Sequence, residues 1–239
     1  MTGPLEAPMD TEVNGIPFSV LISQAAKLKT AQAAPSRSKY DGYPSFYQHS
    51  IYPREKVSQA RLKDFHERMA DAIEMKNEGN EAFKQLRFDD AIVQHEMAIA
   101  VFRFLENINP AWQSEVRRNG ALCNTHHHSS YLFFKGIKDE FIREHCFESG
   151  DEDEKTEVNN FLLTCYTNMA VIANRAMKFK LAIEACDEAI IMDKTNVKAL
   201  FLRSIARIKP KSARSADEHL ATKDLELAME ISPGNRHIR

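Results

Sequence analysis

The chain has 239 residues, of which 28% are charged, and its formal net charge is −2. Because acidic and basic residues are mixed and nearly balanced, the composition argues against a nucleic-acid-binding surface, which usually needs a basic patch. The chain contains no run of about 18 apolar residues, so no transmembrane helix is predicted, and its N-terminus lacks the pattern of a signal peptide. The four cysteines (Cys123, Cys146, Cys165 and Cys186) form no CxxC pair. This favours reduced thiols in a cytosolic or nuclear protein.

Residues 1–52 contain eight of the 17 glycines and prolines and little regular pattern, so we expect a flexible N-terminal segment. Within it, the apolar run Phe18 to Leu28 predicts one short amphipathic helix, which we interpret as a local docking segment or transient helix rather than a binding motif. Aromatic residues that follow are candidates for packing against the first structural unit: Tyr40, Tyr43, Phe46, Tyr47 and Tyr52.

A long helix is predicted to begin near Pro53, because proline is tolerated in the first helical turn. Apolar residues recur at near-helical spacing from Val57 to Ile73, and no helix-breaking residue precedes Gly79. We therefore expect one uninterrupted helix that continues into the first helix of a repeated unit.

The segment 75–99 predicts two antiparallel helices with small residues at their contacts. Gly79 precedes Ala91 by 12 residues, and Ala91 precedes Ala98 by seven. The same intervals separate Ala170, Ala182 and Ala189, and the interval of seven separates Ala221 and Ala228. Repeated helical hairpins with small residues at such offsets are typical of tetratricopeptide repeats. The predicted fold is therefore an all-α helical-hairpin solenoid of three repeats.

We expect this domain to span residues 53–233, with repeats at about 72–105, 163–196 and 197–233. Ala91 and Ala182 are 91 residues apart, whereas one repeat has about 34, so a long insertion is predicted at about 106–162. Its first part is expected to extend the preceding helix to Asn109-Pro110, and the acidic stretch 148–157 to be a solvated loop. Residues 234–239 are predicted to start a capping helix that is truncated or missing.

Four polar residues are candidates for an anion-binding site. Lys76 and Asn80 are four residues apart and therefore share one helical face. Asn168 and Lys198 occupy inward positions of the first helices of repeats two and three. Two ammonium groups and two amides are thus expected around one concave groove. Such groups donate directed hydrogen bonds to carboxylates.

Three stretches resemble the carboxylate-clamp tetratricopeptide domains of heat-shock protein co-chaperones. They are KNEGNEAFKQLRFDDAI, YTNMAVIANRAMKFKLAIEACDEAI and NVKALFLRSIARI. The resemblance covers about residues 76–233 and is strongest to the domains of FK506-binding immunophilins and of the aryl-hydrocarbon-receptor-interacting protein. It implies binding of the acidic C-terminal tail of heat-shock protein 90 or 70, which ends in Glu-Glu-Val-Asp.

The resemblance also implies roles for individual residues. The family's counterparts of Lys76, Asn80 and Asn168 hold the terminal carboxylate of the tail. The counterpart of Lys198 contacts the aspartate side chain or the backbone nearby, and the position of Phe83 often supplies an apolar contact.

One position departs from the family pattern. The family usually has arginine or lysine four residues after the counterpart of Lys198, where this chain has Leu202. The adjacent Arg203 is rotated by about 100° around the helix. The sequence leaves three alternatives: the tail binds more weakly, Arg203 reaches round to it, or the preferred tail differs.

The predicted function is a non-catalytic adaptor that binds the tail of heat-shock protein 90 or 70. One alternative is a tetratricopeptide scaffold for another peptide, or for a partner of the insertion or of the convex face. Another is the regulatory part of an immunophilin-type peptidyl-prolyl isomerase without its catalytic domain, because residues 1–52 are too few for a domain of about a hundred residues.

No cofactor or metal is expected. His126, His127 and His128 lie near Cys123, His145 and Cys146 in the sequence, but no spacing supports a tetrahedral site, so a solvated polar loop is predicted. The sequence contains no nucleophile–base pattern and no phosphate-binding loop. His95 and His219, on second helices of repeats, are interpreted as packing or surface residues, and the oligomeric state is left open.

Overall fold

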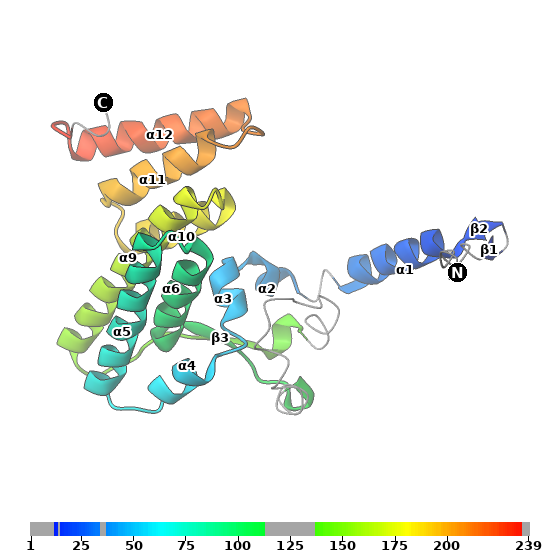
Figure 1. Cartoon of the computed structure of the whole chain (residues 1–239), viewed down its shortest axis with the longest axis horizontal. Helices are drawn as coiled ribbons and strands as arrows, with labels where there is room; N and C mark the ends of the chain where they lie inside the picture. The colour runs from blue at the N-terminus through cyan, green and yellow to red at the C-terminus, as the bar shows by residue number, and fades with distance from the viewer. Residues whose placement is uncertain (1–11, 14, 34–36, 113–136, 236–239) are drawn as a thin grey trace, which may run out of the picture.

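A computed structural model describes residues 12–13, 15–33, 37–112 and 137–235. Three helical hairpins form its body and stack in chain order (Figure 1). They comprise α5 (Phe65–Lys84) with α6 (Phe88–Phe102), α9 (Glu152–Arg175) with α10 (Phe179–Met192), and α11 (Val197–Ile208) with α12 (Ser215–Ile231). The all-α solenoid of three hairpins that the sequence predicts is confirmed.

Small residues lie at the helix contacts of every hairpin, as predicted. The predicted small residues are all fully or almost fully buried: Gly79, Ala91, Ala98, Ala170, Ala182, Ala189, Ala221 and Ala228. Ser204 occupies the equivalent position of α11 and is also buried. At Gly79 the contact is closest, because an added Cβ atom would lie 2.4 Å from Nδ1 of His95 on the neighbouring helix. Gly79 therefore does not interrupt α5. Its lack of a side chain is required for the close approach of α5 and α6.

The hairpin turns of repeats one and two have the same geometry. Leu86 and Met177 both adopt left-handed backbone conformations, with φ of 60° and 58°. Each follows the small residue of its first helix by seven positions, so the two repeats share one turn type. The third hairpin has a longer connection, 209–214.

The uninterrupted helix expected from Pro53 is wrong. Helix α4 (Glu55–Ala60) ends, and α5 begins after Asp64. The side chain of Asp64 accepts a hydrogen bond of 2.9 Å from the backbone N–H of Glu67, which caps α5. Such capping satisfies a backbone donor that a helix terminus otherwise leaves free. The guanidinium of Arg61 also donates to the carbonyl of Ala100, which ties the turn to α6.

The expected extension of α6 to Asn109-Pro110 is also wrong. After α6 the chain forms strand β3 (Phe104–Asn107), which pairs antiparallel with β4 (Ile142–His145). Phe104 lies opposite His145, and their rings stack with centroids 4.7 Å apart. A short 3₁₀ helix, η3 (Asp139–Phe141), precedes β4.

The acidic stretch predicted as a solvated loop instead starts α9. Glu152, Asp153 and Glu154 occupy the first helical turn, and Asp151 caps it by accepting a 2.8 Å hydrogen bond from the N–H of Asp153. Negative side chains are favourable at this end because the helix dipole is positive there. Helix α9 therefore includes the last part of the predicted insertion.

The expectation of a flexible segment is wrong for residues 37–52. Helix α3 (Ser45–His49) packs against α6 and β3, and α2 (Ser38–Gly42) packs against η3; Tyr40, Phe46 and Tyr47 are buried in the main core. The hydroxyl groups of Tyr47 and Tyr166 form a short hydrogen bond. The Oγ of Ser45 donates to Glu184 on α10 over 2.6 Å. Phe46 and Tyr47 of α3 thus contact Tyr166 of repeat two, and α3 also contacts α6 of the first repeat, where the sequence predicted the packing.

The predicted helix at Phe18–Leu28 is confirmed as part of α1 (Phe18–Ala33), which projects away from the hairpins (Figure 1). It follows a small antiparallel pair of strands, β1 (Glu12–Val13) and β2 (Ile16–Pro17). Residues 236–239 of the predicted capping segment lie outside the described residues.

Candidate functional site

The first helices of the three hairpins, α5, α9 and α11, lie next to one another in chain order, with α9 in contact with both others. We call the side of these helices that carries Lys76, Asn80, Asn168 and Lys198 the inner face. Equivalent positions of a repeat face the same way, because each hairpin uses the same small-residue contacts.

Asn80 and Asn168 meet at the boundary between α5 and α9. The Nδ2 of Asn168 donates a hydrogen bond of 3.4 Å to Oδ1 of Asn80. The amide group of Asn80 keeps two N–H donors and that of Asn168 keeps one. These two predicted residues, 88 positions apart in the sequence, therefore form one cluster of donors.

Lys76 lies at the same boundary, one helical turn before Asn80. Its Nζ is 5.5 Å from the centroid of the Phe161 ring on α9, a geometry that suits a cation–π interaction. Burial raises the pKa of the Cys165 thiol to about 12, and the ammonium of Lys76 opposes this shift. Within the described ranges, no carboxylate forms a salt bridge with Lys76. Its charge is therefore not neutralised by a neighbouring acid.

His95, beneath this cluster, is fully buried. Its Nδ1 is 2.9 Å from the carbonyl oxygen of Ala91, and its Nε2 has no partner among the described residues. Burial lowers the pKa of His95; the hydrogen bond to Ala91 opposes the shift, and the positive charge of Lys76 adds to it. The interpretation of His95 as a packing residue is confirmed. His219 is exposed on α12.

Lys198 lies in the first turn of α11, and its side chain is exposed. Asn196 caps this helix by accepting a 2.9 Å hydrogen bond from the N–H of Ala199. No ion pair engages Lys198 in the part of the chain that the structure describes. It is on the inner face by its position in the repeat, but no contact joins it to the Asn80–Asn168 pair.

The guanidinium of Arg203 is held away from the inner face. It donates to Asp187 on α10 over 2.6 Å and to Asp224 on α12 over 2.6 Å, and its side chain is only 17% exposed. Arg207 binds the same Asp224. With its guanidinium paired to α10 and α12, Arg203 does not reach round to the inner face.

The two remaining predicted positions are apolar and partly buried. Leu202 packs against the main core, and its carbonyl oxygen accepts a 3.1 Å hydrogen bond from Asn174 on α9. Phe83 packs on Phe88, with ring centroids 5.9 Å apart. Both side chains are half-buried, so each has a limited exposed surface for a ligand.

Phe161 was missed because the sequence analysis assigned it to the insertion. The sequence pattern that indicates a helix through Phe161 is the helical spacing of Val158, Phe161, Leu162 and Cys165, all of which are buried on α9. Because α9 begins before repeat two was predicted to start, it places this ring beside Lys76.

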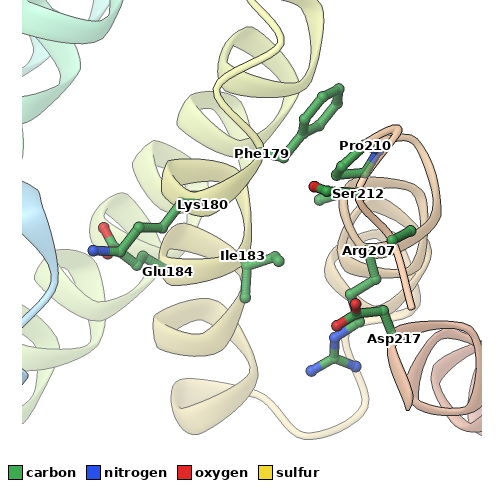
Figure 2. A pocket seen from close by; sticks show the side chains of 10 residues that line it. Phe179, Lys180, Ile183, Glu184, Arg207, Pro210, Ser212 and Asp217 are labelled. Atoms are coloured by element: carbon green, nitrogen blue, oxygen red, sulfur yellow. The ribbon is translucent and has the colours of Figure 1, made fainter. Parts of the chain in front are cut away.

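A separate cavity of about 380 Å³ lies between α10 and the connection from α11 to α12. In Figure 2, Phe179 and Ile183 point toward the segment that carries Pro210 and Ser212, whereas Lys180 and Glu184 point away from it. The cavity shares none of its lining residues with the inner face.

The other candidate ligands do not form a site in the described residues. His145 lies in β4 and pairs with Glu106 over 2.7 Å, and Cys146 is exposed. His126, His127, His128 and Cys123 lie outside the described residues. Within the described ranges, no group of acidic, histidine and cysteine side chains could hold a metal ion, and no helix is long and apolar enough to cross a membrane.

The chain is similar in structure to tetratricopeptide-repeat domains. The C-terminal TPR-containing domain of a Plasmodium falciparum FK506-binding protein superposes with a TM-score of 0.50 at 21% identity, over 74% of this chain and 87% of that domain. The TPR domain of Arabidopsis OM64 matches with a TM-score of 0.41 at 20% identity, over 71% and 89% of the two chains. No family model matches the sequence. The first of these similarities shows that the chain has the fold of a tetratricopeptide-repeat domain.

Proposed function

We propose that this chain is a non-catalytic adaptor whose inner face binds the C-terminal carboxylate of a protein partner. The partner proposed from the sequence resemblance is heat-shock protein 90 or 70, through its acidic tail. An adaptor of this kind would act in the cytosol or the nucleus. The observation that carries the proposal is the hydrogen-bonded pair of Asn80 and Asn168 beside Lys76.

The chemistry of this cluster suits a terminal carboxylate. Lys76 supplies a positive charge that no acidic side chain neutralises within the described residues, and the two amides keep three N–H donors. Hydrogen bonds from a cation to a carboxylate are short and about twice as strong as neutral ones. Lys198 adds a second ammonium further along the inner face.

The experiment is a calorimetric titration with two acetylated peptides that end in Met-Glu-Glu-Val-Asp, one as the free acid and one as the C-terminal amide. The proposal expects binding of the acid and at least about tenfold weaker binding of the amide, because one charge-assisted interaction is lost. Equal affinity for the two peptides, or no binding of either, would refute it.

A further inference from the structure

The inner face has two boundaries, one between α5 and α9 and one between α9 and α11. Residues at equivalent positions of the repeats can be compared at the two boundaries. At the first boundary, Asn80 follows Gly79 by one position and Asn168 precedes Ala170 by two. These two positions make contact, since Asn168 donates to Asn80 over 3.4 Å.

The equivalent positions at the second boundary, between α9 and α11, are apolar. Val171 follows Ala170 by one position, and Leu202 precedes Ser204 by two. Both side chains are half-buried. Asn174 joins the two helices at this level, because its Nδ2 donates to the carbonyl of Leu202 over 3.1 Å. The pair that is polar at the first boundary is therefore apolar at the second.

Helix α11 continues this apolar surface. Ile205 lies seven residues after Lys198 and therefore on the same helical face; its side chain is half-buried. The two arginines of α11 cannot add charge here, because Arg203 and Arg207 are both paired with Asp224. Apart from Lys198 in its first turn, the inner face of α11 is therefore apolar.

We infer that the peptide bound by the inner face carries apolar side chains immediately before its C-terminal residue, which contact Leu202, Ile205 and Val171. This inference rests on the carboxylate site of the proposed function, and it expects that site to bind an apolar tail more tightly than the acidic tail of heat-shock protein 90 or 70. Packed helices are about 8–10 Å apart, and an extended chain advances about 3.3 Å per residue. A peptide whose carboxylate binds at the first boundary thus reaches the second within about three residues.

The test compares two acetylated peptides, Met-Leu-Leu-Val-Asp and Met-Glu-Glu-Val-Asp, each as the free acid and as the C-terminal amide, by calorimetry with the full chain. The unmodified protein is expected to bind the leucine peptide about tenfold more tightly, because apolar surface is removed from water. Leu202→Arg should reverse the order, since it places a cation beside the glutamates.

A second variant and a control test the inference independently of whether Leu202→Arg folds. Ile205→Asn keeps Leu202 and is expected to lower affinity for the leucine peptide alone. Ile191→Asn changes an isoleucine that is 68% exposed on α10 and should alter neither affinity.

The outcomes separate the inference from the proposed function. Equal binding of both free acids, with no binding of their amides, would overturn the inference and leave the carboxylate site intact. A preference for leucine that neither Leu202→Arg nor Ile205→Asn reduces would also overturn it. Absence of binding by both free acids would refute the proposed function and the inference together.

Discussion

The imidazole of His95 fills the space beside Gly79 where another residue would place its Cβ atom. That atom would lie 2.4 Å from Nδ1 and 2.6 Å from Cε1 of His95, and 3.2 Å from the carbonyl oxygen of Ala91. The ring is anchored by its hydrogen-bond contact with Ala91 and is fully buried. It therefore cannot move aside without disturbing the contact between α5 and α6.

Gly79→Ala should destabilise the protein by about 1–3 kcal/mol, the usual cost of overpacking a core, although alanine is the better helix former by about 1 kcal/mol. Urea unfolding monitored by circular dichroism measures the change. Gly150→Ala is the matched control, because a Cβ atom there meets nothing within 4 Å. In a double-mutant cycle, His95→Ala should remove most of the penalty of Gly79→Ala; additive effects would show that the clash is not the cause.

The buried His95 should make the protein less stable in mild acid. Burial lowers its pKa below the ordinary value, so below about pH 6.5 the unfolded chain binds a proton that the folded chain does not. The contribution of His95 to the free energy of unfolding is thus fully present above the pKa that His95 has in the unfolded chain. It falls by up to about 1.4 kcal/mol per pH unit as the pH drops toward the pKa that His95 has in the folded chain.

Urea unfolding from about pH 7.5 to about pH 5.5 measures this loss, and His95→Phe should reduce it. His49 provides a contrast, because its hydrogen bond to Glu96 raises its pKa. The contribution of His49 is present at low pH and lost as the pH rises through its folded pKa, so His49→Gln should make the acid loss larger. Identical pH profiles for His95→Phe and the unmodified protein would contradict the assignment.

Lys76→Ala should weaken binding of the free-acid peptide ending in Met-Glu-Glu-Val-Asp by about tenfold to a hundredfold, because a hydrogen bond to a charged group contributes about 1.5–3 kcal/mol. Asn80→Ala should also lose most of the binding. Both variants should retain their helicity by circular dichroism. The affinity of the unmodified protein should fall as salt is added.

Lys84→Ala is the matched control for Lys76→Ala. Lys84 is on the same helix, its side chain is 73% exposed, and it pairs with Glu81 over 3.3 Å. If Lys84→Ala weakens binding as much as Lys76→Ala does, general electrostatic attraction accounts for the effect. Unchanged binding in both Lys76→Ala and Asn80→Ala would refute the carboxylate site.

The sequence by itself determined the repeated hairpins and the part of the candidate site that lies on α5. Close approach of two helices needs small residues at fixed offsets, so Gly79, Ala91 and Ala98 and their equivalents were readable as a pattern. The helical period alone placed Lys76 and Asn80 on one face.

Only the tertiary structure decided the features that depend on residues far apart in the chain. Strand β3 exists because β4 pairs with it, although Phe104 and His145 are 41 positions apart. The direction of Arg203 is decided by Asp187 and Asp224 on two other helices, and ion pairs of this kind leave no periodic signal in the sequence. The aromatic residues of α2 and α3 are ordered for the same reason, because their burial depends on surfaces that the folded repeats create.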